Sequence, residues 1–482
     1  MLQKIMNNKF FITASIPYVN ARPHVGLALE FIQTNVIARY NKLIGNDVLT
    51  LSGTDENALK NVQASEKDGL PIQEFVDRNN VWFERLSELL NAKFDVWQRG
   101  SNQLTHYPAS QKLWNLCQKD IYKKKYKGRY CVGCELYYEP EELNQDGECN
   151  EHPGIKLDEV EEDNYFFALS KYQDQIIKLI ETNELEIVPN ERKNEALTFI
   201  KSGLKDISIS RSNERAKNWG VPVPNDPTQR AYVWLDALNI YQSGIGFGWD
   251  DEKYNKWWPA DVHVIGKGII RFHAIYWPAF LLSAGLKLPK KIMVHGYYTV
   301  NGQKMSKTLG NVYDPVPLLE KYGADPLRYY CLAKTPPFTD GDFSESKFIE
   351  SYNSDLANGL GNLVARVAKL CEKESFEFTA DAWRFEEEPF EKIRQNLDKF
   401  KFNDALGIIW GWISDLDKKI EEHKPWVLSP ENLKLRLDDY VNQIRMIATA
   451  LQPFLPETAE KILAQFAEPT IKSGEILFPR IK

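Results

Sequence analysis

The sequence predicts an α/β fold in which a Rossmann-type parallel sheet is split by an insertion and followed by an α-helical bundle. Three observations support this prediction. Apolar runs alternate with helical patterns over residues 9–112 and again over 228–330, as in parallel α/β sheets. A cysteine-rich segment between these two stretches breaks the alternation. After Tyr330 only helical spacing of apolar residues remains.

The composition is that of a globular protein with several domains. The chain has 482 residues, of which 43% are hydrophobic and 26% charged. No apolar run is long enough to span a membrane, and the segment from Met1 to Lys9 is too polar for a secretory signal. The net charge of -7 disfavours indiscriminate binding of nucleic acid but allows local basic patches. Six cysteines are too few for a disulfide scaffold, so we expect a reducing, cytoplasmic location.

The first α/β unit carries a candidate anion site. The apolar run from Phe10 to Ile16 predicts a buried strand, and the spacing from Ala28 to Leu43 predicts a helix that Gly45 ends. His24 and Gly26 lie in the turn between them. A helix N-terminus at the carboxyl edge of a parallel sheet suits a phosphate, to which histidine can donate a hydrogen bond. Taken alone, this stretch is equally consistent with a histidine that only caps the helix.

The insertion contains two short ligand pairs. Cys131-Val132-Gly133-Cys134 is followed by Cys149-Asn150-Glu151-His152, both in turn-rich sequence. A C-x-x-C pair matched by C-x-x-H predicts a zinc knuckle with the ligands Cys131, Cys134, Cys149 and His152. Four protein ligands leave no open position on the metal, so we expect a structural role in a segment with little core of its own. The alternative is a set of cysteines scattered through the core.

The second half of the sheet is predicted to begin at Tyr232–Ala237, an apolar run that indicates a buried strand. Strands are also predicted over Val262–Ile265 and Lys291–Gly296, with a helix over Ile269–Leu282 between them. That helix carries an aromatic stripe formed by Phe272, His273, Tyr276 and Trp277. Such a stripe is usually core, but with a few polar groups it also suits a pocket for a small apolar ligand.

A cationic loop follows a predicted hairpin over Tyr297–Gln303. It reads Lys304-Met305-Ser306-Lys307-Thr308-Leu309-Gly310-Asn311, with two lysines and nearby hydroxyls. Lysine is a point charge on a flexible stem and suits a loop that closes on phosphates. By itself the loop fits a solvated surface turn better.

The remaining chain is helical. Helices are predicted over 344–371, 384–400, 403–422, 431–451 and 456–466, which together indicate a bundle. The expected division is a first Rossmann half (1–112), the insertion (113–227), a second Rossmann half (228–330), a connecting region (331–345) and the bundle (346–482).

Taken together, these segments resemble the class I aminoacyl-tRNA synthetases, and among them the methionyl-tRNA synthetase family with a single zinc knuckle. The paired signatures are His24-Val25-Gly26-Leu27 and Lys304-Met305-Ser306-Lys307-Thr308. Further matching segments are Ile16–Asn20, Gly53–Glu56, Tyr232–Ala237, Phe272–Pro278, Asp325–Tyr330 and the cysteine pairs. Each motif is modest alone, but their order and spacing over the whole chain are specific.

The resemblance implies two reactions. L-Methionine and ATP form methionyl-adenylate and diphosphate, and the methionyl group then passes to tRNA(Met). The carboxylate nucleophile is already ionised at pH 7, so the first step needs alignment and positive charge rather than a general base. The implied catalytic residues are His24, Lys304 and Lys307. The implied ATP-binding residues are His24, Gly26, Lys304, Ser306, Lys307 and Thr308, with Mg²⁺ on the phosphates and one structural Zn²⁺ in the insertion.

The resemblance also implies two binding surfaces. The methionine pocket is formed by Ile16, Tyr18, Asp55, Trp234, Ala237, Tyr241, Phe272, His273 and Trp277, with Asp55 pairing the ammonium group. The anticodon is read in the bundle by Asn362, Arg366 and Trp426, and residues 331–345 belong to a stem-contact region. Without the resemblance, Trp426 is better explained as a core anchor at a helix start.

Some positions depart from the family pattern. Leu27 replaces a histidine, Asn57 and Ala58 replace a His-Gly pair, Gly268 replaces an aspartate and Thr308 replaces a serine. These departures leave open a catalytically weakened paralogue that only binds tRNA. Another class I synthetase is a further alternative, although large editing insertions are missing. Because the sequence ends directly after the bundle, without the family's optional C-terminal dimerising domain, we expect a monomer.

Overall fold

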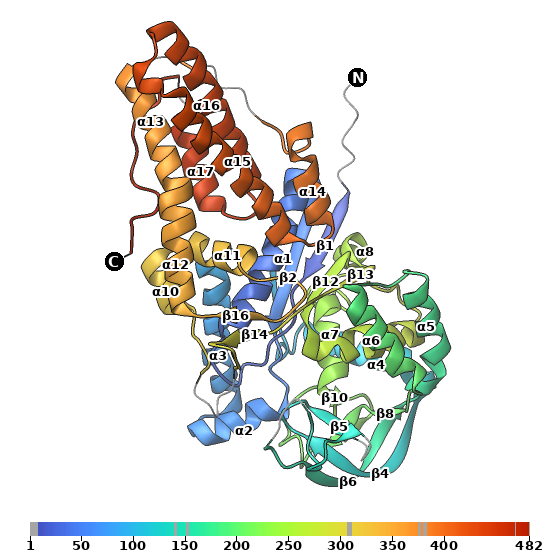
Figure 1. The fold of residues 1–482 in the computed structure, drawn as a ribbon. Helices are drawn as coiled ribbons and strands as arrows, with labels where there is room; N and C mark the ends of the chain where they lie inside the picture. The colour runs from blue at the N-terminus through green and yellow to red at the C-terminus, as the bar shows by residue number, and fades with distance from the viewer. Residues whose placement is uncertain are drawn as a thin grey trace.

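The computed structural model describes residues 8–138, 142–150, 154–305, 311–374, 377–378, 383–467 and 469–481, and only the backbone of Lys304. Figure 1 shows a central sheet with flanking helices, a smaller sheet at the lower right and a long helical bundle at the upper left. This arrangement confirms the predicted mixed fold, in which a parallel sheet is combined with a helical C-terminal region.

A parallel six-stranded sheet forms the centre. Strand β1 (Lys9–Thr13) pairs with β2 (Asp47–Thr54) on one side and with β12 (Val262–Gly266) on the other. The order β3-β2-β1-β12-β13-β7 is completed by β3 (Val96–Arg99), β13 (Lys291–His295) and β7 (Glu186–Val188). The two predicted halves therefore meet at β1. In such sheets ligands bind outside the carboxyl ends of the strands where the order reverses.

Helices cover both faces of this sheet. On one face, α1 (Val25–Leu43) and α3 (Ile72–Leu89) share a continuous apolar core with the C-terminal bundle. The other face packs against α4 (His106–Cys117), α7 (Val233–Ser243) and α9 (Trp277–Ala284). The shorter helices are α2 (Leu59–Asp68) and α8 (Asp251–Trp257). A π-helix at Phe272–Tyr276 precedes α9 within the predicted helix 269–282.

The predicted strand at Tyr232–Ala237 is wrong. Tyr232 follows the end of β11 (Asp226–Ala231) and is the N-cap of helix α7. Every residue of α7 is buried, including the polar Asp236. A helix buried on all sides has no polar face, so its apolar run cannot be distinguished from a buried strand by periodicity.

The insertion forms its own antiparallel sheet. The long strands β4 (Ile121–Cys131) and β6 (Asp158–Phe167) pair along their whole length, and the order β5-β4-β6-β8 is completed by β5 (Leu136–Tyr138) and β8 (Ile207–Ser208). A lysine-rich strand thus faces a glutamate-rich one, which favours this register; Lys125 and Glu161 form an ion pair of 3.1 Å. A second small sheet contains β9 (Ser210–Ser212), β10 (Pro222–Val223) and β11.

One edge strand of the main sheet lies inside the range expected for the insertion. Residue Ile187 of β7 is paired with Ile292 of β13 in parallel register. Helices α5 (Gln173–Glu181) and α6 (Asn190–Lys201) flank β7 in the sequence. Residues 113–227 therefore contain both a separate sheet and part of the Rossmann sheet. A strand of three residues is too short to show a pattern in the sequence.

The C-terminal part begins with a small sheet of order β15-β14-β16, formed by β14 (Tyr298–Val300), β15 (Gln303–Lys304) and β16 (Gly341–Phe343). The helices that follow or lie between these strands are α10 (Val316–Tyr322), α11 (Ala324–Ala333), α12 (Glu345–Ser351), a π-helix at Tyr352–Gly361, α13 (Asn362–Glu374), α14 (Glu391–Asp398), α15 (Phe402–His423), α16 (Pro430–Leu451) and α17 (Pro456–Gln465). Within the described parts of the chain, no helix has the length and apolarity needed to cross a bilayer.

Arg328 of α11 fixes the bundle to the sheet domain. Its guanidinium is fully buried and donates to three backbone carbonyls, those of Phe454 (2.7 Å), Leu90 (3.1 Å) and Pro453 (3.0 Å). Leu90 caps α3 on the Rossmann side, whereas the other two carbonyls follow α16 in the bundle. One side chain therefore satisfies buried acceptors from both parts.

Replacing Arg328 by methionine is expected to lower the free energy of unfolding by about 3–5 kcal/mol, because three buried carbonyls lose their donors. Urea denaturation of the full chain measures this loss. Arg85→Met is the matched control, since its ion pair with Glu320 (2.7 Å) is exposed and contributes at most about 1 kcal/mol. Equal losses in the two variants would contradict a joining role for Arg328.

Candidate active site

The first signature lies at the N-terminus of α1, beside the carboxyl end of β1. His24 is the N-cap residue, and its Nδ1 accepts a hydrogen bond of 3.1 Å from the backbone N–H of Gly26. An accepting Nδ1 places the proton of a neutral imidazole on Nε2. The capping role and the donor role considered for His24 therefore use different ring nitrogens and are compatible.

The chain around the second signature lies at the same end of α1. A Cβ on Gly26 would lie only 3.2 Å from the terminal methyl of Met305, so glycine leaves room for the segment after β15. The backbone N–H of Val25 donates to the carbonyl of Tyr313 at 3.0 Å. Met305, the second residue of the predicted loop, and Tyr313, which follows the loop, thus both lie at the start of α1. Ser306, Lys307 and Thr308 themselves lie outside the described residues.

Asp55 follows the end of β2 and is almost completely buried. Its backbone N–H donates to the carbonyl of Pro17 at 2.9 Å, and it forms a parallel bridge with Tyr18. Burial and the neighbouring carboxylates of Asp236 and Glu135 raise the pKa of Asp55 well above its ordinary value. A cationic ligand would relieve this unfavourable environment.

Aromatic rings pack against one another beside Asp55, which is bridged to Tyr18. The rings of Trp234 and Phe272 stack with a centroid distance of 3.5 Å, and Tyr18 meets Trp234 edge to face at 6.3 Å. The hydroxyl of Tyr18 is buried and has no hydrogen-bond partner among the described residues. Six of the nine predicted pocket residues belong to one apolar cluster, namely Ile16, Tyr18, Trp234, Tyr241, Phe272 and Trp277.

Of the three other predicted pocket residues, Asp55 follows β2, whereas Ala237 and His273 lie on the elements that carry Trp234 and Phe272. Ala237 is buried on α7, one turn after Trp234, and His273 is buried in the π-helix. The hydroxyl of Tyr241 and Nε2 of His273 are hydrogen-bonded at 2.8 Å, and Nδ1 of His273 contacts the carbonyl of Ile269 at 3.0 Å. Burial lowers the pKa of His273 to about 4, so the imidazole is neutral at pH 7. Nδ1 therefore donates to the carbonyl, and Nε2 accepts from the tyrosine.

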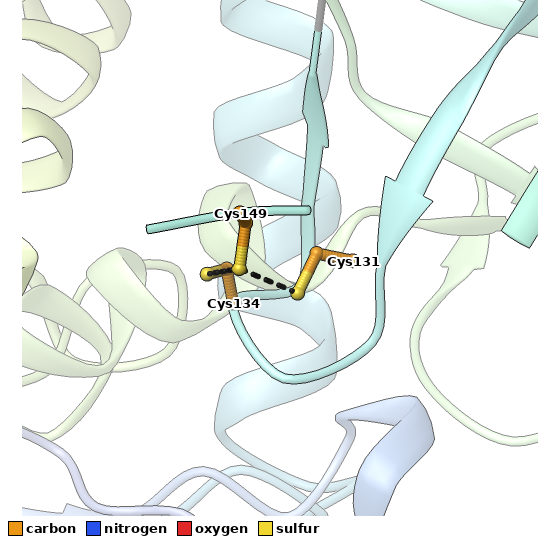
Figure 2. Close-up of side chains that lie close together, drawn as sticks. All are labelled: Cys131, Cys134 and Cys149. Atoms are coloured by element: carbon orange, nitrogen blue, oxygen red, sulfur yellow. Dashed lines mark hydrogen bonds between the residues drawn. The ribbon is translucent and has the colours of Figure 1, made fainter. Parts of the chain in front are cut away.

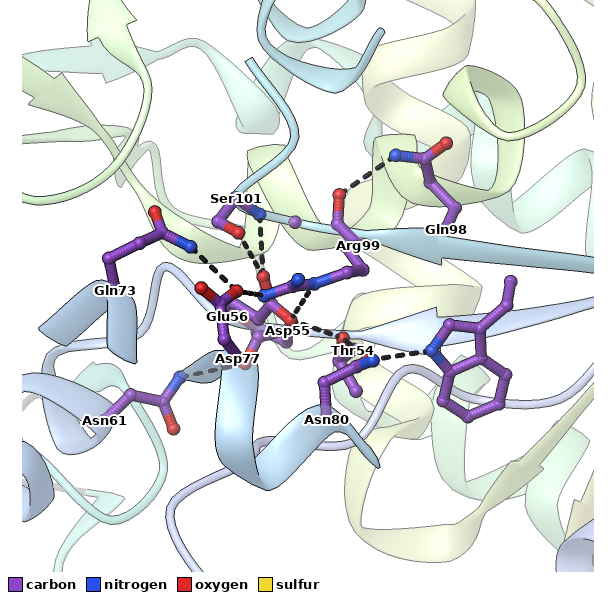
Figure 3. Close-up of polar contacts among 12 residues, drawn as sticks. Thr54, Asp55, Glu56, Asn61, Gln73, Asp77, Asn80, Gln98, Arg99 and Ser101 are labelled. Atoms are coloured by element: carbon purple, nitrogen blue, oxygen red, sulfur yellow. Dashed lines mark hydrogen bonds and ion pairs between the residues drawn. The ribbon is translucent and has the colours of Figure 1, made fainter. Parts of the chain in front are cut away.

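A buried polar network holds the backbone on the other side of Asp55 (Figure 3). Glu56 is fully buried and accepts hydrogen bonds from Arg99 Nε (2.7 Å), Thr54 Oγ1 (2.8 Å) and the backbone N–H of Ser101 (3.2 Å). Arg99 also reaches Asp77 on α3 at 2.5 Å. These contacts tie the end of β2 to the end of β3 and to α3, so Asp55 sits on a rigid turn.

Asn57, one of the departures from the family pattern, belongs to a second buried network of hydrogen bonds. The amide nitrogen of Asn57 donates to Asp236 at 2.6 Å and to the carbonyl of Gly100 at 2.8 Å. Asp236 is also hydrogen-bonded to Nε2 of His106 at 2.6 Å, while Nδ1 of His106 contacts Ser243 at 2.8 Å. Asn57 is therefore built into the support of α7. The sequence offered no signal for His106, because its partner carboxylate is distant in the chain.

Gly268 and Leu27, two other departures from the family pattern, also fit the surrounding structure. A Cβ on Gly268 would lie 2.0 Å from the hydroxyl oxygen of Tyr297, so the space of the usual aspartate is occupied by that tyrosine. Leu27 is buried in the core cluster shared by α1 and the bundle. At both positions the space is therefore filled by packed side chains.

Three cysteines of the predicted knuckle converge (Figure 2). The sulfur atoms of Cys131, Cys134 and Cys149 all lie within 4.8 Å of one another, and Cys149 is 3.3 Å from Cys131 and 3.7 Å from Cys134. The hydroxyl of Tyr138 donates to the Cys134 sulfur at 3.2 Å. Three clustered thiols with a second-layer donor match the donor set that zinc prefers. The fourth predicted ligand, His152, lies outside the described residues.

The predicted anticodon residues share one surface of the bundle. Asn362 and Arg366 are four residues apart on α13, which places them on the same helix face. The guanidinium of Arg366 lies 5.7 Å from the ring centroid of Trp426 and pairs with Asp417 (3.2 Å) and Glu421 (2.6 Å). Trp426 is 52% exposed, so it is not a core anchor.

Comparison with known proteins decides the family. The profile of the class I tRNA synthetases (M) matches residues 10–368. A methionine–tRNA ligase of Thermotoga maritima is 41% identical over 471 residues, covering 94% of this chain and 74% of the relative. The chain belongs to the methionyl-tRNA synthetase family. Another relative, the methionine–tRNA ligase of Brucella suis, is 40% identical over 481 residues, with 96% and 93% of the two chains covered.

Solved structures of this synthetase family have the same overall fold as this chain. A Mycobacterium tuberculosis methionyl-tRNA synthetase in complex with methionyl-adenylate has a TM-score of 0.91 and 36% identity, covering 98% of this chain and 100% of the other. The free form of that synthetase has a TM-score of 0.83 and 33% identity over 98% of each chain. These comparisons confirm the predicted family and give no support to a non-catalytic paralogue or to another class I synthetase.

Proposed function

We propose that the protein is a methionine–tRNA ligase, which activates L-methionine with ATP and transfers the methionyl group to tRNA(Met). The observation that carries the proposal is the meeting of the two signature segments at the N-terminus of α1. Met305 follows Lys304 within the lysine-bearing loop, Tyr313 comes just after the loop, and both lie against that helix end. A carboxylate and an aromatic cluster lie at the ends of the neighbouring strands of the same sheet.

The amino-acid site combines one charge with a shaped apolar wall. Asp55 pairs with the methionine ammonium, which offsets the burial of this carboxylate. The thioether is proposed to lie against the stacked rings of Trp234 and Phe272, where sulfur–aromatic contacts contribute about 0.3–1.5 kcal/mol. Because Tyr241 and His273 are hydrogen-bonded to each other, neither is committed to the sulfur atom, and shape does most of the selection.

The nucleotide site uses positioned positive charge. His24 Nε2 donates to a phosphate oxygen, and the positive end of the α1 dipole faces the same group. Lys304, Ser306, Lys307 and Thr308 are proposed to close over the phosphates, and Gly26 gives them room. Mg²⁺ on the phosphates, when bound, neutralises part of their charge. The methionine carboxylate then attacks the α-phosphate with diphosphate as the leaving group.

ATP–diphosphate exchange with each of the twenty amino acids tests the proposal. Exchange is expected only with methionine. Lys307→Ala should lower its rate by about 10²–10³-fold, because one charge that stabilises the transition state is lost, while methionine affinity changes little. An exchange rate in Lys307→Ala equal to that of the unmodified protein would refute the role of this lysine. Exchange with another amino acid, or with none, would refute the proposed function.

Methionine affinity is expected to fall as the pH is lowered. The ammonium group binds ionised Asp55, whose pKa is raised in the free protein by burial, Asp236 and Glu135. Binding therefore requires loss of a proton below that pKa, and affinity should drop up to about tenfold per pH unit there and be constant above it. Calorimetric titration of methionine between pH 5 and 8 measures this. Asp55→Asn should bind weakly at every pH, and an unchanged slope in that variant would contradict the assignment.

A single structural zinc ion is proposed for the cysteine cluster. Cys131, Cys134 and Cys149 would supply three thiolates, and His152 the fourth ligand. Metal analysis of the purified protein should find about one zinc per chain. Cys149→Ser should lose the metal and melt at a lower temperature, since metal binding is coupled to folding of such segments. Full retention of stoichiometric zinc in this variant would contradict the assigned ligand set.

The bundle is proposed to read the anticodon. An exposed indole offers a stacking platform for a single-stranded base, and the amide of Asn362 and the guanidinium of Arg366 can bond base edges. Arg366 must exchange its contacts with Asp417 and Glu421 for contacts with RNA. We further propose that the protein acts as a monomer in the cytoplasm, which light scattering of the pure chain and localisation of a tagged chain would test.

Replacing Trp426 by alanine is expected to lower kcat/KM for tRNA by about 10–100-fold, because one base loses its stacking partner. Methionine-dependent exchange should be unchanged, since Trp426 lies in the bundle between α15 and α16. Val427→Ala is a suitable control, because this neighbouring side chain is 71% exposed but lacks a ring. Normal aminoacylation by Trp426→Ala would exclude the indole from anticodon recognition.

A further inference from the structure

The loop that carries the first two cysteines contacts a residue of the proposed amino-acid pocket. The indole Nε1 of Trp234 donates to the carbonyl of Cys134 at 3.4 Å, and the hydroxyl of Tyr232 donates to the carbonyl of Glu135. Glu135 is fully buried and has a positive φ of 54°, in the left-handed region. The position of this loop therefore directly affects the position of an indole in the proposed pocket.

Lys60 of α2 lies between the loop and the pocket. Its ammonium donates to the carbonyl of Gly133 at 2.7 Å and lies 3.4 Å from the centroid of the Tyr18 ring. The backbone N–H of Lys60 donates to the carboxylate of Glu135 at 3.1 Å. One residue thus contacts the cysteine-bearing loop by two groups and a proposed pocket residue by its charge.

We infer that Lys60 is a positioning residue that connects the cysteine-bearing loop to the methionine pocket by holding the ring of Tyr18 in place. The inference rests on the proposed function, because it assigns Tyr18 to the methionine site. A cation over the face of a tyrosine ring attracts the ring electrostatically, which restricts the positions that the ring can take. Tyr18 in turn meets Trp234 edge to face, so the position of Lys60 affects two walls of the pocket.

Burial lowers the pKa of Lys60, and the neighbouring carboxylates oppose this shift and favour its ammonium form. Asp55 and Glu135 are buried carboxylates near Lys60, and Arg211 approaches Glu135 at 3.5 Å from the other side. Without Lys60, Asp55 would have one cation fewer nearby and the Gly133 carbonyl would lose its donor. Both effects act on the amino-acid side of the site, whereas the contacts of His24 and Gly26 at the start of α1 are separate from Lys60.

The test compares Lys60→Met, which keeps the stem but removes the charge, with Lys60→Arg and with Lys67→Met, an exposed lysine on the same helix. We expect Lys60→Met to raise the methionine Kd, measured by calorimetry without ATP, by about tenfold. The KM for ATP, kcat at saturating methionine and the bound metal should stay within about twofold of the unmodified protein. Lys60→Arg should recover most of the affinity, and Lys67→Met should lose none.

A double variant tests the contact itself. In a Tyr18→Leu background, Lys60→Met should cause little further loss of methionine affinity, because the ring that Lys60 holds is absent. Full additivity would overturn the inference, as would an unchanged methionine Kd in Lys60→Met, loss of metal, or a parallel loss for both substrates together with a lower melting temperature. Failure of the unmodified protein to bind methionine would instead refute the proposed function.

Discussion

The pairing of β1 with strands from both halves of the chain is the constraint on which the site depends. Because β1 lies between β2 and β12, the polypeptide leaves the sheet in opposite directions at this point, and the carboxyl ends of the strands are open to a ligand. His24 follows β1, Asp55 follows β2, and the π-helix with His273 follows β12. Residues with different chemical roles therefore lie at one edge of the sheet.

Buried charges near this edge are arranged in compensating sets. Glu56 is held by Arg99, while Glu135 lies between Arg211 and the backbone of Lys60. Buried carboxylates are costly unless they are paired and hydrogen-bonded, so each set also fixes the backbone that carries it. Among these carboxylates, the charge of Asp55 is the least compensated by cations and hydrogen-bond donors. This is expected of a carboxylate that binds a cationic ligand.

The bundle and the insertion both make specific contacts with the sheet domain that carries the site. Arg328 connects the bundle to α3 through three backbone carbonyls, and the cysteine-bearing loop contacts Trp234 and Lys60. A structural metal in that loop would thus influence the amino-acid pocket without taking part in the chemistry. The structural role predicted from the sequence therefore extends beyond the insertion itself.

The sequence by itself determined the family, the alternation of strands and helices, the cysteine pairs and most helices of the bundle, because these depend on local spacing and on motif order. It could not identify the segment 232–237 as helical, since a fully buried helix has no polar face, nor could it find β7, which is only three residues long. The contacts of Lys60, the pairing of His106 with Asp236 and the occupation of the space beside Gly268 were decided only by tertiary structure. Each of them joins residues far apart in the chain, and their distances depend on how the insertion and the sheet pack together.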